Sequence, residues 1–197
     1  MPDYSQVLQN ISKHIALDQR EIDYFLSLLT EKEVRKKESI LKEGQTCSLI
    51  NYVHAGALRA YYRDRDNNES SIMFAVNDWW VTDMYSFASG KPAMLNIDAL
   101  EDSALFQLQK EDLEKLYNAV PRFERFFRII MQNAYIREQL RAIENLSLPA
   151  EDRYANFTKK YPQFARRIPL KQIASYIGIT PEFLSVLRKK GMGKKIS

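Results

Sequence analysis

Near the start of the chain, apolar residues recur at the spacing of one helix face. The residues on this face are Ile22, Phe25, Leu26 and Leu29. Asp18 stands just before them, where an Asp commonly caps the first turn of a helix. The pattern predicts helical structure within residues 4–30.

From Glu33 onwards the pattern changes to short stretches rich in β-branched and aromatic residues, separated by turn-forming residues such as Ala55-Gly56 and Asp66-Asn67-Asn68. The expected strands lie within residues 34–36, 39–41, 49–53, 58–62, 70–76, 95–100 and 103–108. Strands this short, with turns this frequent, are typical of an antiparallel β-roll of the jelly-roll type. Because helical patterns flank this region, we expect the α+β fold class.

The helical period returns at about residue 110. A short helix over residues 111–119 is expected to end at Val120-Pro121, and Pro121 suits the first turn of a longer helix that reaches about Leu146. Two apolar stripes run along this longer helix, and one of them is expected to pack against the β-roll. Its members are Phe123, Phe127, Ile130 and Ala134.

The other stripe follows a seven-residue repeat. Phe126, Asn133 and Leu140 occupy one heptad position, and Ile129, Ile136 and Ile143 occupy the position three residues later. The repeat predicts a dimer interface, in which a buried Asn133 paired with its symmetry mate would fix a parallel, in-register homodimer. The alternative is a helix that docks within a monomer and keeps Asn133 at the solvent edge.

Residues 147–197 begin with a predicted helix over residues 149–160 and continue into a helix-turn-helix pattern over residues 170–189. Gly178 stands where the turn needs a positive φ, and Thr180 can cap the second helix with Pro181 at its first position. The apolar residues on which the two helices would pack are Ile173, Ile177, Ile179, Leu184 and Leu187.

Charge is unevenly distributed along the chain. Residues 1–145 hold 18 Lys and Arg against 22 Asp and Glu, whereas residues 146–197 hold 11 basic residues against three acidic ones. A basic segment behind a slightly acidic body favours a polyanion-binding module. Because the helix-turn-helix pattern lies inside this segment, the expected partner is double-stranded DNA.

The second helix of this pattern is expected to enter the major groove, with its first half at base edges and its far end at phosphates. The expected DNA-binding residues are Lys171, Thr180, Pro181, Glu182, Ser185, Arg188, Lys189 and Lys190.

Several other classes of protein are disfavoured. No apolar run approaches the roughly 18 residues of a membrane span and no signal peptide is visible, so a cytoplasmic protein without a membrane partner is expected. The single Cys47 excludes an intramolecular disulfide, and His14 and His54 lack metal-ligand spacing. We therefore expect no enzyme, no metal site and no cofactor; a haem sensor, the remaining alternative, would need His54 or Cys47 as axial ligand.

The order of β-roll, long helix and helix-turn-helix resembles that of the Crp/Fnr family of bacterial transcription regulators over residues 20–190. Besides the helix-turn-helix, the stretches that carry the resemblance are 41–45 (LKEGQ), 52–59 (YVHAGALR) and 77–80 (NDWW). The resemblance implies a cyclic-nucleotide-binding-like domain with N-terminal helices over 1–110, connecting and dimerisation helices over 111–146, and a DNA-binding domain over 147–197. It also implies a homodimer on a palindromic operator, with RNA polymerase as a candidate partner.

The sequence departs from the family's pattern in the stretch that holds cyclic AMP in some members. There a Gly-Glu pair and an Arg bind the phosphate, whereas residues 81–95 contain no such pair, and Ala93 or its neighbour stands in place of the Arg. Lys91, between Gly90 and Pro92, is expected in an exposed turn. We therefore expect no response to cyclic AMP.

The same stretch could line an apolar pocket for another, unidentified small-molecule effector. The candidate residues are Trp79, Trp80, Asp83, Met84, Tyr85, Phe87 and Lys91. The alternative is that these aromatic side chains simply fill the β-roll.

A second departure lies in the helix-turn-helix. Val186 stands where related proteins often place an Arg that reads guanine, and the chain ends at Ser197, without room for the β-hairpin wing of some members. These features keep open an alternative function, a ligand-sensing dimer that has lost specific DNA binding.

Overall fold

The structure is a computed structural model that describes residues 2–193, and the side chains of residues 2–189. Within this range the chain forms two compact units. Unit 1 holds residues 2–60 and 74–136, and unit 2 holds residues 61–73 and 137–193. The predicted domain boundaries after residues 110 and 146 separate regions by their expected function, and they stay predictions.

Within residues 2–193, eight strands form two four-stranded sheets, in the orders β1-β8-β3-β6 and β2-β7-β4-β5. The strands are β1 (Leu29–Val34), β2 (Ser39–Leu41), β3 (Leu49–Ala55), β4 (Ala57–Arg63), β5 (Glu69–Val76), β6 (Trp79–Val81), β7 (Asn96–Ala99) and β8 (Ser103–Gln109). The pairs β1–β8, β3–β8, β3–β6 and β2–β7 are antiparallel. The predicted antiparallel β-roll and the α+β class are therefore confirmed.

The turn between β3 and β4 requires a glycine. Gly56 has a φ of +102°, and a Cβ built there would meet Ser103 Oγ at 2.1 Å. Both the conformation and the close approach of β8 exclude larger residues. The inner side chains of the roll are large and apolar, and Tyr52, Leu58, Phe74, Ile97, Leu105 and Leu108 are among those that are fully buried.

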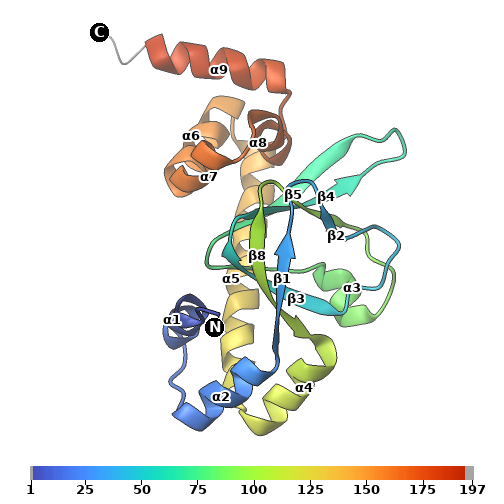
Figure 1. Ribbon diagram of the computed structural model, residues 1–197. Coiled ribbons are helices and arrows are strands. Elements are labelled where there is room, and N and C mark those ends of the chain that lie inside the picture. Colours follow the sequence, from blue (N-terminus) through green and yellow to red (C-terminus); the bar gives the residue numbers. More distant parts are fainter. Residues whose placement is uncertain (1, 194–197) are drawn as a thin grey trace. The chain divides into compact units, whose positions relative to one another are not determined.

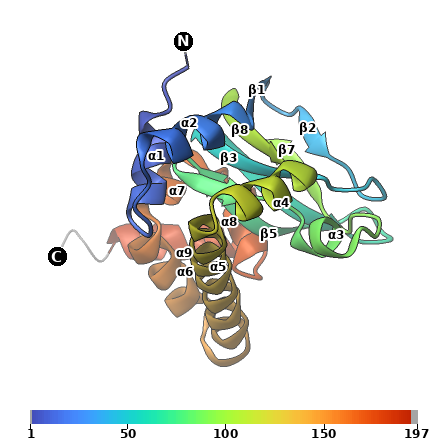
Figure 2. The ribbon, with the colours of Figure 1, turned by 90° about the horizontal axis from the view of Figure 1, so that it is seen from below.

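The N-terminal region forms two helices, α1 (Ser5–Ser12) and α2 (Gln19–Ser27), which lie side by side (Figure 1, Figure 2). Asp18 caps α2 as predicted, because its Oδ1 accepts a hydrogen bond from the Glu21 amide at 2.9 Å. The prediction of helical structure up to residue 30 is wrong at its end. There Leu29 begins β1 and pairs with Leu108 of β8, so long-range strand pairing outweighs the local helical spacing.

A polar network attaches α1 to the β-roll. Asp78 Oδ1 accepts hydrogen bonds from Asn10 Nδ2 at 2.8 Å and from the Tyr52 hydroxyl at 2.9 Å. Lys13 Nζ lies 2.7 Å from Asp78 Oδ2, and the Trp80 indole donates to Asn10 Oδ1 at 3.0 Å. Each buried polar atom of the network is thereby paired, which fixes α1 against the roll.

Two helices follow the roll, α4 (Lys110–Ala119) and the long α5 (Arg122–Ser147), as the sequence predicts. In unit 1, Phe123, Phe126 and Phe127 of α5 are buried. Phe123 stacks on Phe25 of α2 with ring centroids 4.9 Å apart, and Phe127 meets the edge of Trp80 at 5.4 Å. This aromatic stripe forms the contact between α5 and the rest of unit 1.

Unit 2 contains the end of α5 and four further helices, α6 (Ala150–Lys160), α7 (Pro162–Arg167), α8 (Leu170–Tyr176) and α9 (Pro181–Gly193) (Figure 1). Its core is a second apolar cluster, formed by Phe157, Phe164, Ile173, Tyr176, Leu184 and Leu187. Among the helices within residues 2–193, none has the length and hydropathy needed to cross a membrane.

Candidate nucleic-acid interface

The turn between α8 and α9 has the predicted helix-turn-helix geometry. Gly178 adopts a φ of +70°, and a Cβ there would have only Asn145 Oδ1 nearby, at 3.8 Å. Position 178 therefore favours glycine because of the positive φ, and not because neighbouring atoms leave no room for a side chain. Thr180 Oγ1 accepts a hydrogen bond from the Phe183 amide at 3.2 Å, so Thr180 caps α9 as predicted.

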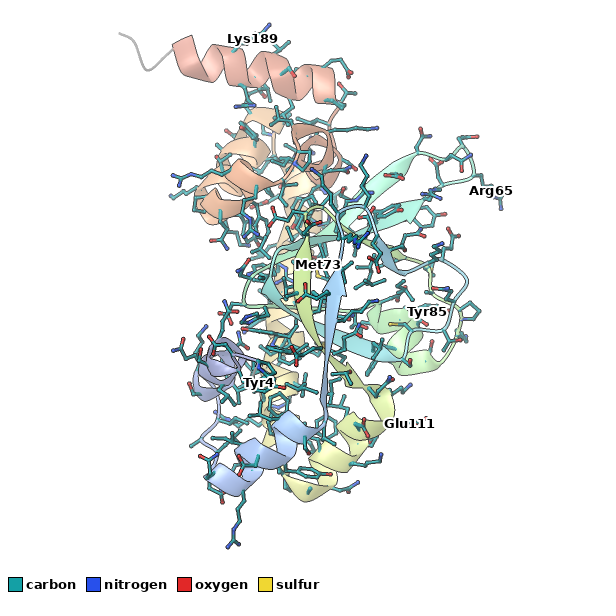
Figure 3. The ribbon with its side chains drawn as sticks, in the orientation of Figure 1. Tyr4, Arg65, Met73, Tyr85, Glu111 and Lys189 are labelled. Atoms are coloured by element: carbon teal, nitrogen blue, oxygen red, sulfur yellow. The ribbon has the colours of Figure 1, made fainter. Side chains whose placement is uncertain are left out.

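Packing leaves one face of α9 free within unit 2. Leu184 and Leu187 are buried, and Ile173 and Ala174 of α8 have no exposed surface. Six other side chains of α9 among those that the structure describes are exposed: Glu182, Phe183, Ser185, Val186, Arg188 and Lys189. Figure 3 shows Lys189 on the side of α9 away from α8. A second helix with this exposed face is the element that reads a major groove in helix-turn-helix proteins.

The predicted DNA-binding residues lie on or next to α8 and α9. Lys171 is exposed at the start of α8, and Thr180 is exposed at the start of α9. Pro181 is half-buried, and the Ser185 hydroxyl donates to its carbonyl oxygen at 2.9 Å. Lys190 lies within the span of α9, but its side chain lies outside the described part of the structure.

Phe183 is a candidate contact that the sequence reasoning missed. It is 42% exposed and lies beside Val186, which is 46% exposed. Apolar side chains on the exposed face of a recognition helix can contact thymine methyl groups. The signal was present in the sequence, because residues 183 and 186 are each one position before the packing residues Leu184 and Leu187.

The hairpin of β4 and β5 binds directly to α8 within unit 2. The Ser175 hydroxyl accepts a hydrogen bond from the Ser71 amide at 2.8 Å and donates to the Glu69 carbonyl at 3.0 Å. The Ser71 hydroxyl in turn lies 3.3 Å from Gln172 Oε1. Since β5 is the last strand of its sheet, the Ser175 hydroxyl takes the place of a neighbouring strand at this point.

Arg141 of α5 links the hairpin and α8. Its Nη1 donates to the carbonyl oxygens of Ser71 at 3.4 Å and Tyr176 at 3.5 Å, and its Nη2 lies 2.8 Å from Glu138 Oε2. The guanidinium lies 4.6 Å from the centre of the Tyr176 ring, a cation–π contact. Burial raises the pKa of the Tyr176 hydroxyl well above its ordinary value, so this ring stays neutral.

The predicted effector residues have three different surroundings in unit 1. Trp79 is half-buried and Trp80 is buried, and consecutive strand residues point to opposite faces of a sheet. The Trp80 indole packs against Phe126 and Phe127 of α5. Phe87 is buried, as is Ala93. Met84, Tyr85 and Lys91 are exposed, so Lys91 lies on the surface as expected.

Asp83 occupies the centre of the loop that corresponds to the phosphate-binding stretch. It is 1% exposed and caps the short helix α3 (Met84–Ser89). Its Oδ1 accepts from the Ser86 amide, and its Oδ2 accepts from the amides of Met94 and Leu95, each at 3.0 Å. Three backbone amides of this loop, those of Ser86, Met94 and Leu95, therefore bind the chain's own carboxylate.

Beyond the buried aromatic stripe, α5 presents apolar side chains to solvent. Ile136, Leu140 and Ile143 are 51%, 47% and 52% exposed. Asn133 is exposed and Ile129 is half-buried. Phe126, which the heptad pattern places on the same stripe, is fully buried in unit 1 and has no surface left for a partner.

The comparisons with known proteins agree with this geometry. Residues 31–119 match the family model described as the cyclic nucleotide-binding domain. No curated protein sequence matches the chain. Among solved structures, FixK2 from Bradyrhizobium japonicum is 20% identical with a TM-score of 0.75, and the match covers 85% of this chain and 86% of that one.

Two further structures have the same arrangement. The c-di-GMP-responsive global regulator CLP from Xanthomonas campestris is 15% identical with a TM-score of 0.73, and the match covers 91% of this chain and 94% of CLP. A putative regulator of the Crp/Fnr family from Eubacterium rectale is 13% identical with a TM-score of 0.67, over 90% of this chain and 85% of that one. At these identities the likeness establishes a shared fold.

Proposed function

Because residues 31–119 match the cyclic nucleotide-binding domain family and the chain has the fold of Crp/Fnr transcription regulators, we propose that it is a sequence-specific DNA-binding transcription regulator that acts as a homodimer. The observation that carries the proposal is the helix-turn-helix of unit 2. There Gly178 and Thr180 set the turn, and α9 leaves a polar and basic face exposed.

The exposed face of α9 supports a division of roles. Glu182 and Ser185, in its first half, are placed to read base edges, with Phe183 and Val186 available for thymine methyl groups. Arg188 and Lys189, in its second half, are available for phosphates, together with Lys171 of α8. In a two-fold dimer the two recognition helices would read half-sites about 34 Å apart, so the operator is a palindrome.

The exposed stripe of α5 supports the homodimer. Ile136, Leu140 and Ile143 are about half exposed and lie at heptad spacing, with Asn133 at the central polar position. Pairing with a second copy would bury these side chains and would give Asn133 its symmetry mate. Ile129 marks the beginning of the proposed dimer interface, because Phe126 is already enclosed within the protomer.

Asp83 supports a regulator that does not respond to cyclic AMP. A cyclic phosphate in this loop would have to displace a buried carboxylate that accepts three backbone hydrogen bonds. Ala93 offers no charge to compensate, and Lys91 lies on the surface. The loop within residues 81–95 is therefore stabilised by the chain's own Asp83 and not by a bound nucleotide.

A fluorescence-anisotropy titration tests the proposal, with an operator selected from random duplexes and its single-mismatch variants at several salt concentrations. Lys189→Ala is expected to weaken binding to every duplex and to lower the salt slope by about one unit, whereas Lys159→Ala, on α6, is the matched control. Glu182→Ala or Ser185→Ala is expected to change preference at one base pair per half-site by about 1–3 kcal/mol.

The outcomes separate the two functions considered for the chain. If Glu182→Ala and Ser185→Ala keep wild-type discrimination at every base pair, α9 is not the reading helix. If no duplex is selected at all, the alternative of a ligand-sensing dimer without specific DNA binding is favoured, in line with Val186 at a position where an Arg would read guanine.

A further inference from the structure

We propose that a pocket in unit 2, between α5, α6 and α8, binds a small phosphate-bearing anion. The pocket is an open depression, and its empty space of about 400 Å³ includes solvent at its mouth. Its charged lining consists of Arg137 and Arg141 from α5, Arg153 and Lys160 from α6, and Glu144. Four cationic side chains thus face a pocket that holds one carboxylate in its wall.

Neighbouring carboxylates offset this charge only in part. Glu138, beside the pocket, lies 3.6 Å from Arg137 Nε and 2.8 Å from Arg141 Nη2, so it balances one of these two guanidinium groups. Glu144 accepts a hydrogen bond from Asn156 Nδ2 at 3.3 Å. With both carboxylates counted, the lining and its neighbour Glu138 carry two more cationic than anionic groups, which favours an oxyanion as the ligand.

Arg153 provides an independent sign of an absent partner. Its Nη1 donates to the carbonyl oxygen of Asn145 at 3.0 Å, which holds the guanidinium at the pocket wall. Its Nε is buried and has no hydrogen-bond partner among the described residues. A buried guanidinium N–H without an acceptor costs free energy, and a shift of the Arg153 side chain towards an oxyanion in the pocket would supply the acceptor.

The remaining walls suit a small, partly flat ligand. Lys160 Nζ lies 5.3 Å from the centre of the Tyr161 ring, so the ammonium is placed beside an aromatic surface and stays exposed to the pocket mouth. Tyr176 and Phe157 also line the pocket. One guanidinium group can bind two phosphate oxygens at once, and an exposed Lys adds a point charge. The phosphate group is therefore the part of the ligand that this lining recognises.

The position of Arg141 connects this pocket to the helix-turn-helix. The same guanidinium that lines the pocket donates to Ser71 of the hairpin and to Tyr176 at the end of α8. An anion that draws Arg141 towards the pocket therefore weakens its contacts with the hairpin and with α8. The proposed regulatory step is that the anion changes DNA binding through Arg141. This step rests on the proposed function, whereas the binding of the anion does not.

Calorimetry with inorganic pyrophosphate, at constant ionic strength and without DNA, tests the site. We expect saturable binding to the wild type, and about tenfold weaker binding to Lys160→Gln and to Arg153→Gln. Lys159→Gln, an exposed neighbour outside the pocket, is expected to keep wild-type affinity. Because Arg153→Gln also removes the bond to Asn145, Lys160→Gln is the decisive variant, with a thermal melt of each protein as a control for folding.

Three results would overturn the proposal. The first is the absence of saturable binding to the wild type, and the second is an equal loss of affinity in Lys159→Gln and Lys160→Gln. The third is loss of pyrophosphate binding in Lys189→Ala, which would place the anion on α9, where DNA phosphates are expected.

For the regulatory step, pyrophosphate at the lowest concentration that saturates the wild type is expected to change the operator Kd at least threefold in the wild type and much less in Lys160→Gln. If the operator Kd is unchanged in a protein that binds both pyrophosphate and the operator, the regulatory step alone is refuted.

Discussion

Units 1 and 2 each bring several hydrogen-bond donors to one place, and they satisfy them in different ways. In unit 1 the amides of Ser86, Met94 and Leu95 converge on the buried carboxylate of Asp83. In unit 2, cationic side chains such as Arg153 and Lys160 surround a pocket with fewer carboxylates than cations. A set of convergent donors therefore indicates a ligand site only where the chain supplies no acceptor of its own.

The apolar side chains of α5 show the same contrast. The first turns of the helix, in unit 1, bury Phe123, Phe126 and Phe127. The later turns leave Leu140 and Ile143 about half exposed. The aromatic stripe of α5 is enclosed within its own protomer, whereas the later turns of α5, the exposed side of α9 and the unit 2 pocket keep surfaces available for a second copy, for DNA and for a small anion.

The largest effect is expected from charges on the exposed part of α5. The double substitution Leu140→Glu with Ile143→Glu would place four unpaired carboxylates in the proposed dimer interface, at a total cost of more than about 6 kcal/mol. Light scattering at micromolar concentration should then show a monomer. Ala142→Glu, exposed on another face of the helix, is the matched control and should remain a dimer. If the wild type is itself a monomer, the exposed turns of α5 are not a dimer interface.

The buried part of α5 should respond through stability and not through association. Phe126→Ala removes a fully buried ring that contacts Trp80 and Phe127, so we expect a loss of about 3–5 kcal/mol in the free energy of unfolding. Urea denaturation measures this loss, and light scattering should still show the dimer under native conditions. Dissociation without a loss of stability would mean that Phe126 belongs to the dimer interface after all.

Removal of the built-in anion is expected to cost somewhat less. Asp83→Ala abolishes the cap of α3 and leaves two further amides without an acceptor, which together cost about 2–4 kcal/mol. Thermal or urea unfolding checks this value, with the exposed Lys91→Ala as a control near the wild-type stability. Calorimetry of the wild type should show no binding of cyclic AMP, and micromolar binding that is lost in Lys91→Ala would refute our interpretation of the loop.

The smallest effect is expected at the hairpin of unit 2. Ser175→Ala removes the hydroxyl that bonds Glu69 and Ser71, and we expect a loss of about 1–2 kcal/mol together with faster amide exchange at Ser71. Ser70→Ala, at an exposed neighbouring position, should leave both quantities unchanged. Equal exchange in the two variants would show that the hairpin does not depend on α8.

Much of this architecture could be predicted from the sequence because it depends on local chemistry. The positive φ at Gly178, the cap at Thr180 and the helix break at Val120-Pro121 each follow from the preference of one or two residues. The short strands of the roll follow from equally local alternation and turns.

The parts that could not be predicted depend on contacts distant in sequence. The heptad pattern cannot tell Phe126 from Leu140, because it does not show which turns of α5 the β-roll covers. The absence of a Gly-Glu pair gave the negative conclusion about cyclic AMP, but it did not show that Asp83 occupies the loop. The unit 2 pocket combines side chains from helices with no shared sequence motif.

The bonds between Ser175 and β5 have a consequence for the folding of the chain in a crowded solution. A strand at the end of a sheet offers free amides and carbonyls to any other chain, and such edges promote aggregation. β5 is such a strand, and at Glu69 and Ser71 its backbone groups are occupied by a side chain of α8. Until α8 has folded, this edge stays available to other chains, so a helix that is synthesised well after β5 protects this strand from intermolecular pairing.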